Sequence, residues 1–87
     1  MGPRVVVYGT ERCGYCRAAE ELLRRRGIAF EPIDVTGDDA RRGWLVERTT
    51  FRTVPQIFID GEPIGGYEEL AALDRKGEFA LRGLVSA

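Results

Sequence analysis

The stretch VVVYGTERCGYC, residues 5–16, decides the fold of this chain. It begins with a β-branched run typical of a buried strand and passes through a short polar loop to a Cys-x-x-Cys motif. A helical pattern follows from Gly14 to Arg26, with alanines and leucines on its apolar side. We therefore expect a strand that delivers a cysteine pair to the first turn of a helix.

Cys13 and Cys16 are the only two cysteines in the sequence. The unpaired N–H groups of a first helical turn and the helix dipole stabilise a negative charge on Cys13, which is nearest that end. Thiol pKa values in such motifs fall from about 8.5 to roughly 3.5–7.5, and the thiolate is the form that attacks disulfides. Cys16, one turn deeper, is placed to displace whatever Cys13 has captured. The spacing indicates a dithiol redox site.

Two other interpretations of the pair are weaker. A structural disulfide that closes so short a loop removes little chain entropy and stabilises little. A zinc site needs more ligands, and the chain has no histidine and no further cysteine. A soft-metal site within one subunit is therefore nearly excluded, whereas a metal that bridges two subunits remains open.

The composition is that of a soluble globular protein, with 44% hydrophobic and 31% charged residues. We expect a single domain over residues 1–87. A net charge of −1 predicts neither a nucleic-acid nor a membrane-surface partner. No apolar run is long enough for a membrane span or a signal peptide. We therefore expect a cytoplasmic protein, where reactive cysteine pairs are usually catalytic.

Periodicity and turn residues predict the remaining elements. We expect strands over 4–8, 28–35, 57–59 and 62–64, and helices over 14–26, 38–48, 67–75 and 78–85. Trp44 and Leu45 are expected to be the main buried contacts of the second helix. Asp60-Gly61 is a strong hairpin signal between the last two strands.

This order of elements predicts an α/β fold with a four-stranded mixed sheet flanked by helices. The first two strands, joined by a helix, form a right-handed parallel unit, and the last two form an antiparallel hairpin. Pro63 predicts that the final strand lies at an edge of the sheet. The loop that carries Cys13 then leaves the carboxyl end of the first strand, where open α/β sheets usually place their chemistry.

Three segments together resemble a dithiol glutaredoxin of the small bacterial type: YGTERCGYC (8–16), RTVPQIFI (52–59) and IGGYEEL (64–70). The resemblance extends from about Arg4 to Leu84. It implies a thioredoxin-like fold and glutathione-dependent reduction of protein disulfides and glutathione mixed disulfides. It also implies a cis peptide bond before Pro55, and such bonds usually mark a tight turn. A turn of this kind leaves the backbone of Val54 able to hold a peptide as an added strand.

The resemblance also assigns site residues. It makes Cys13 the nucleophile and Cys16 the resolving thiol. It implies an aromatic residue beside the cysteines, a loop that holds the cysteinyl part of glutathione, a helix N-terminus for the γ-glutamyl end and arginines for the glycyl carboxylate. The aromatic residue is Tyr15, and the loop is formed by Thr53, Val54 and Pro55. The helix N-terminus is formed by Gly66, Tyr67 and Glu68, and the arginines are Arg42 and Arg52.

The sequence departs from the family pattern at a few positions. Thr10 stands where the family usually has Lys, and Arg12, beside the first cysteine, is a candidate to supply the missing charge at the glutathione site. Glu68 stands where the family often has Asp. Gly14 stands where many members have Pro, which presets the first helical turn.

Three functions follow from these patterns. The leading one is a monomeric enzyme that acts with glutathione on disulfide-containing or glutathionylated proteins. The second is a carrier in which Cys13 from two subunits and two glutathiones ligate a [2Fe–2S] cluster, an interpretation motivated by Gly14 and opposed by the dithiol pattern. The third is a thioredoxin-like electron donor recharged by a flavoprotein reductase. Apart from the bridging cluster, no metal is expected.

Overall fold

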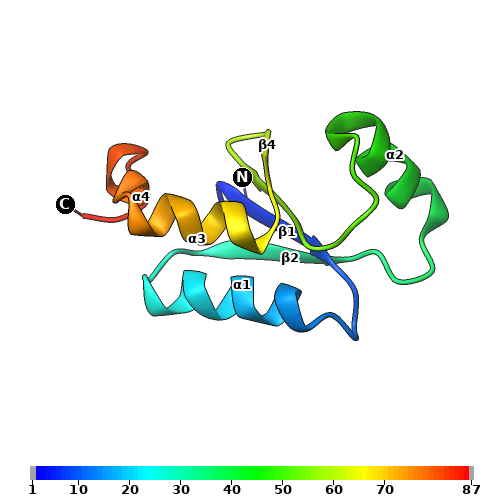
Figure 1. The fold of residues 1–87 in the computed structure, drawn as a ribbon, viewed down its shortest axis with the longest axis horizontal. Helices are drawn as coiled ribbons and strands as arrows, with labels where there is room; N and C mark the ends of the chain where they lie inside the picture. The colour runs from blue at the N-terminus through cyan, green and yellow to red at the C-terminus, as the bar shows by residue number, and fades with distance from the viewer. Residues whose placement is uncertain (1, 87) are drawn as a thin grey trace.

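The computed structural model describes residues 2–86, so Met1 and Ala87, the ends of the expected domain, lie outside the described part. Its elements follow the expected order (Figure 1): β1 (Val5–Gly9), α1 (Gly14–Arg25), β2 (Phe30–Asp34), α2 (Asp39–Thr49), β3 (Gln56–Ile59), β4 (Glu62–Gly65), α3 (Tyr67–Arg75) and α4 (Glu78–Leu81). The boundaries lie within two residues of the expected ones, except at the end of α4. Within residues 2–86, no helix has the length and apolar character needed to cross a membrane.

The strands form one four-stranded mixed sheet in the order β2-β1-β3-β4. Strands β1 and β2 are parallel, whereas β3 runs antiparallel to both β1 and β4. This confirms the predicted architecture. Strand β4, which contains Pro63, lies at one edge of the sheet, as the proline predicts.

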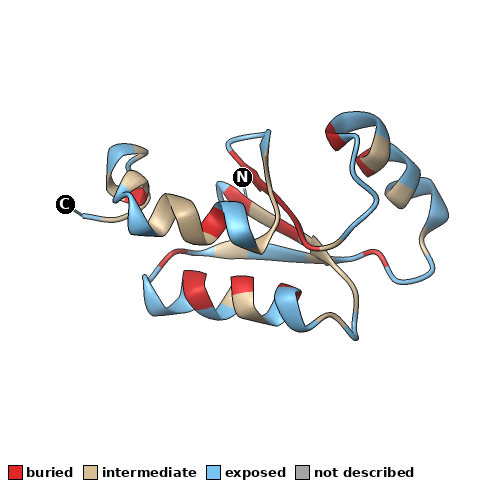
Figure 2. Cartoon of the chain, in the orientation of Figure 1, coloured by how far each residue is buried: buried red, intermediate tan, exposed pale blue. Residues whose placement is uncertain are grey.

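The hydrophobic core lies on both faces of the sheet because successive strand residues point to opposite sides. In β1, Val5 and Val7 pack with residues of α1 and α3, whereas Val6 and Tyr8 pack on the opposite face, where α2 contributes Leu45. Every residue of β3 is buried, since both of its faces are covered. Figure 2 shows the buried residues along the side of α1 that faces the sheet and the exposed residues on its outer side.

The final helix is shorter than expected. The pattern over Glu78–Val85 predicts a continuous helix, but α4 ends at Leu81. Gly83 has a φ of 72°, and the N–H of Leu84 donates to the carbonyl oxygen of Phe79 at 2.9 Å. This left-handed glycine turns the chain back and ends the helix.

Of the two residues expected to be the main buried contacts of α2, only one is buried. Leu45 is buried, but Trp44 remains 39% exposed. The indole ring packs against two other aromatic rings. Its centroid lies 5.8 Å from the ring centroid of Tyr8 and 5.8 Å from that of Phe58. Helix α2 therefore packs on this sheet face with Leu45 buried, while Trp44 stays partly open to solvent above the buried Phe58.

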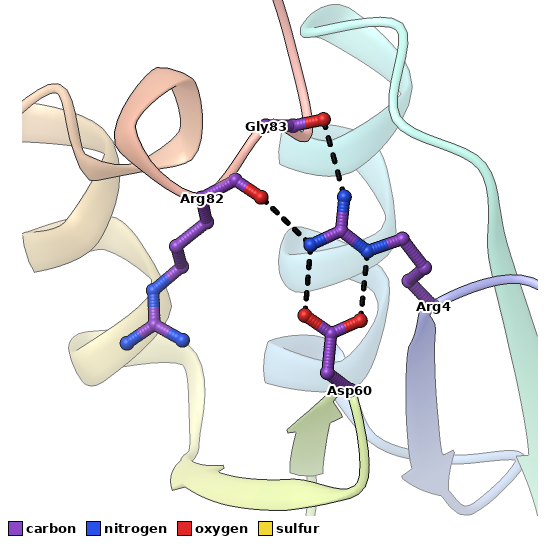
Figure 3. Close-up of polar contacts among 4 residues, drawn as sticks. All are labelled: Arg4, Asp60, Arg82 and Gly83. Atoms are coloured by element: carbon purple, nitrogen blue, oxygen red, sulfur yellow. Dashed lines mark hydrogen bonds and ion pairs between the residues drawn. The ribbon is translucent and has the colours of Figure 1, made fainter.

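Arg4 joins parts of the chain that are distant in sequence (Figure 3). Its guanidinium donates to both carboxylate oxygens of Asp60, at 2.7 and 2.8 Å, and to the carbonyl oxygens of Arg82 and Gly83, at 2.7 and 3.1 Å. The hydrogen bond with Arg4 lowers the pKa of Asp60. The start of β1, the β3–β4 turn and the residues after α4 are thereby linked through one side chain.

Candidate active site

Cys13 is the N-cap residue of α1. Its backbone is extended, with φ −112° and ψ 107°, and its Sγ atom accepts the N–H of Cys16 at 3.1 Å. Serine and aspartate oxygens commonly accept this hydrogen bond at other helices, so the sulfur replaces an oxygen cap. In the reduced protein the same N–H stabilises a thiolate, because hydrogen bonding to a charged form favours that form.

Cys13 and Cys16 form a disulfide, and their Cα atoms are 5.2 Å apart. Cys13 is partly exposed, whereas Cys16 is 4% exposed. An incoming sulfur therefore reaches Cys13 first, whereas Cys16 faces the protein interior.

Gly9 at the end of β1 makes room for the buried sulfur. A Cβ atom at this position would lie 2.7 Å from the Sγ of Cys16, closer than such atoms approach in proteins. Any side chain at Gly9 would displace Cys16. The last residue of the strand thus determines where the second sulfur sits.

The cis-proline loop, Thr53–Pro55, faces the cysteines from β3. The peptide bond between Val54 and Pro55 is cis, as the resemblance implies, and the carbonyl oxygen of Val54 lies 3.7 Å from the Sγ of Cys13. Gln56, which is 2% exposed, donates its Nε2 hydrogen to the carbonyl oxygen of Thr53 at 2.8 Å. This buried amide holds the loop against the sheet.

A groove of about 640 Å³, here called the first groove, runs alongside this loop. It brings together most of the predicted glutathione-binding residues: Tyr15, Thr53, Val54, Pro55, Gly66, Tyr67 and Glu68. The aromatic rings of Tyr15 and Tyr67 lie 6.0 Å apart at one end of it. Side chains from α1, the cis-proline loop and α3 thus line one continuous surface.

The α3 end of the first groove is formed by the N-terminus of α3. Gly66 is the N-cap of α3, and its own N–H is satisfied by Oε1 of Glu69 at 2.7 Å. The N–H groups of the first turn that follow have no acceptor within the helix and point towards its N-terminal end. The exposed carboxylate of Glu68 lines the same end and adds a site for a cation.

The two predicted arginines lie elsewhere. Arg42 and Arg52 line a second groove of about 450 Å³ between α2 and the loop that follows it. The two grooves share Phe51, Thr53 and Val54, so they meet at the cis-proline loop beside Cys13. Arg12 is exposed and lines neither groove.

Sequence reasoning missed several residues of the first groove. Phe51, Arg48 and Gln56 line it, as do Thr49, Pro63, Ile64, Gly65 and Glu69. Phe51 is 57% exposed, and the only sequence signal that could have marked it as a site residue is that it is an aromatic residue in a polar loop. Gln56 and Arg48 reach the groove through tertiary contacts that no local pattern encodes.

The described part of one chain brings no set of metal ligands together. Within residues 2–86, no group of three or more histidine, cysteine or acidic side chains is arranged to hold a metal ion. Cys13 is the one accessible sulfur in this range, because Cys16 is buried.

The chain is similar to known proteins along most of its length. The glutaredoxin family matches residues 5–64. Glutaredoxin 3 of Escherichia coli K12 is 42% identical over 73 residues, which cover 84% of this chain and 88% of that protein. A glutaredoxin of Pseudomonas aeruginosa is 41% identical over 98% of this chain and 99% of its own. The crystal structure of a buckwheat glutaredoxin–glutathione complex superimposes with a TM-score of 0.88 at 28% identity, over 97% of this chain and 83% of that one.

Proposed function

The chain belongs to the glutaredoxin family, and we propose that as a glutathione-dependent thiol–disulfide oxidoreductase it uses Cys13 as the nucleophile and Cys16 as the resolving thiol. We assign these roles from the accessibility of the two cysteines, because Cys13 is partly exposed and Cys16 is buried. The N–H of Cys16, which points at the Sγ of Cys13, supports a thiolate at the accessible position.

On a glutathionylated protein, the Cys13 thiolate attacks the glutathione sulfur. A disulfide forms between Cys13 and glutathione, and the protein thiolate leaves and takes up a proton from solvent. The thiolate of a second glutathione then attacks the glutathione sulfur of the Cys13–glutathione disulfide. Oxidised glutathione is released and the Cys13 thiolate is restored, so Cys16 is not needed.

On a protein disulfide, the Cys13 thiolate forms a mixed disulfide with the substrate. Cys16 loses its proton to solvent and attacks the Cys13 sulfur, which releases the reduced substrate and forms the Cys13–Cys16 disulfide. Two glutathione molecules then reduce that disulfide. Both cysteines are therefore required for this reaction.

Glutathione would span both grooves. Its cysteinyl part would lie along Thr53 and Val54, where the grooves meet, with its γ-glutamyl carboxylate at the N-terminus of α3. Its glycyl carboxylate would reach Arg42 and Arg52 in the second groove, where guanidinium groups match a carboxylate well.

The test is to compare Cys13→Ser and Cys16→Ser on both reactions. Cys13→Ser should abolish both activities, since a hydroxyl is a poor nucleophile at neutral pH. Cys16→Ser should keep deglutathionylation and lose disulfide reduction. Loss of deglutathionylation in a folded Cys16→Ser variant would overturn the assigned roles. A faster turnover with a thioredoxin reductase than with glutathione would favour the thioredoxin-like alternative.

A second candidate is the bridged [2Fe–2S] dimer, for which Gly14 in place of the frequent proline is the motivation. Gly14 is exposed and a Cβ there would meet no atom within 4 Å, so this chain itself does not cover the surface next to Cys13. Cys13 would supply one thiolate per copy, and glutathione held in the first groove would supply the other. Visible absorbance of anaerobically purified protein, with and without glutathione, tests this activity, and a featureless spectrum in both samples would exclude it.

A further inference from the structure

The first groove extends beyond the path proposed for glutathione. That path uses the α3 end and the cis-proline loop. A further part of its lining, here called the β4 end, is formed by Arg48, Thr49, Phe51, Gln56, Pro63 and Ile64. Apart from Phe51, which also lines the second groove, these residues lie outside the path proposed for glutathione.

The β4 end has apolar walls and a polar floor. Phe51 is 57% exposed, and Pro63 is exposed on the edge strand. Gln56, at 2% exposure, lies among them. Its Nε2 is used by Thr53, whereas its Oε1 is buried without a hydrogen-bond partner in the described part of the chain. Buried polar atoms are normally paired, so this acceptor is an unmet hydrogen-bonding group in a residue that lines the groove.

Arg48 supplies the positive charge of the groove. Its guanidinium lies over the rings of Trp44 and Phe58, 5.2 and 5.8 Å from their centroids, and donates to the carbonyl oxygen of Gly61 at 3.3 Å. Within residues 2–86 it pairs with no carboxylate. The aromatic rings hold the cation in place while its remaining N–H groups stay available.

We propose that the β4 end binds the polypeptide of a glutathionylated substrate, with an apolar side chain against Phe51 and Pro63 and an acidic side chain on Arg48. This rests on the proposed function. In a mixed disulfide the polypeptide sulfur is bonded directly to the glutathione sulfur. The residues that flank the modified cysteine must therefore lie beside bound glutathione, and the β4 end is the continuation of the same groove. The enzyme thus prefers cysteines that are flanked by apolar and acidic residues.

The test uses synthetic peptides that carry one glutathionylated cysteine and differ only in the flanking residues. A peptide with Phe and Asp next to the cysteine, placed on either side in turn, is compared with peptides in which Phe becomes Ala or Asp becomes Lys. We expect kcat/KM to fall about tenfold for the Ala peptide, through lost apolar burial. We expect a fall of about two- to fivefold for the Lys peptide, since the ion pair is exposed.

A charge swap separates recognition from a structural effect. Arg48→Glu should prefer the Lys peptide to the Asp peptide, which reverses the order of the wild type. Arg41→Glu is the matched control, because Arg41 lies on the same helix but lines a different groove with Tyr8 and Trp44. It should retain the wild-type order. General damage to the fold would lower activity on every peptide and would not reverse a preference.

The mixed disulfide of glutathione with free cysteine tests the underlying function, because it has no flanking residues. Loss of activity on this small substrate in the wild type would refute the proposed function itself. Full activity on it, combined with equal kcat/KM for all peptides, would overturn the β4-end proposal alone. An Arg48→Glu variant that keeps the wild-type order would do the same. A saturable inhibition by added glutathione that depends on Arg48 would show that a second glutathione, and not the polypeptide, occupies this end.

Discussion

The Sγ atom of Cys13 lies 3.7 Å from the carbonyl oxygen of Val54, across the gap between α1 and the cis-proline loop. A partner sulfur bonded to Cys13 must therefore sit next to the Val54 backbone. The peptide groups on either side of that sulfur then align with the loop and can pair with it as a short added strand. We therefore expect the same pair of residues to position both the sulfur chemistry and the backbone of the substrate.

The first prediction concerns the titration of Cys13. Because the N–H of Cys16 donates to its sulfur at a helix N-terminus, we expect the Cys13 thiol to titrate well below the ordinary value of about 8.5. The rate of alkylation measured against pH in the Cys16→Ser variant gives the midpoint. Arg12→Gln should raise it only slightly, since Arg12 is exposed. A midpoint near 8.5 would remove the argument for an activated thiolate.

The second prediction concerns the arginines of the second groove. Arg42→Gln and Arg52→Gln, made separately, should each raise the KM for a glutathionylated substrate by about tenfold, the equivalent of one charge-assisted hydrogen bond. Reaction of Cys13 with a small disulfide that lacks glutathione should be nearly unchanged. Equal losses on both substrates would instead indicate that these side chains support the fold or the thiolate.

The third prediction concerns the space beneath Cys16. Gly9→Ala places a methyl group 2.7 Å from the Sγ of Cys16, too close for a normal contact, so the buried sulfur must move. We expect the rate of protein disulfide reduction to fall, because that reaction needs Cys16 to reach Cys13. Deglutathionylation, which needs Cys13 alone, should be retained. Gly2→Ala is the control, since a Cβ there would make only an ordinary contact, 3.5 Å from Oε1 of Glu31, before the start of β1 and away from both grooves. A parallel loss of both activities in Gly9→Ala would mean that the substitution disturbs the whole site.

The fourth prediction concerns the ion pair of Arg4 with Asp60. The pKa of Asp60 is lower in the folded protein, mainly through its hydrogen bond with Arg4. A lowered folded-state pKa gives stability that is fully present above the unfolded value of about 3.9 and is lost as the pH falls through the folded value. The free energy of unfolding of the wild type should therefore exceed that of Asp60→Asn by a constant amount near neutral pH.

The difference between these two proteins should shrink as the pH falls below about 4. Asparagine is the suitable replacement because Asp60 has a φ of 52°, a conformation that asparagine tolerates. Urea denaturation over a range of pH measures the effect. A difference that persists unchanged into acid would show that the carboxylate charge contributes nothing.

The sequence predicts the elements of this fold well because each carries a local signal. The β-branched residues of β1, the Asp60-Gly61 turn and Pro63 in the edge strand all specify their conformation through nearby residues. The end of α4 is the exception. There Leu84 continues the apolar pattern, while Gly83 has already reversed the chain. Periodicity reports which residues are apolar, and it does not report where the backbone stops being helical.

The candidate site, like the fold, is predictable from the sequence only where a local motif specifies it. The sequence motifs place both cysteines and the cis-proline loop, and the structure gathers most of the expected residues along one groove. Gln56 and Arg48 could not be predicted, because their places depend on a buried amide contact with Thr53 and on rings from α2 and β3. Nor could the sequence indicate that Arg42 and Arg52 would line a separate groove.

Trp44 gives this protein an intrinsic optical reporter. It is the single tryptophan of the chain, and the guanidinium of Arg48 lies 5.2 Å from the centroid of its ring. A carboxylate that binds Arg48 brings a negative charge beside this cation and so changes the electric field at the excited ring. Emission should then shift with occupancy, so that peptide binding can be followed in real time on unlabelled protein.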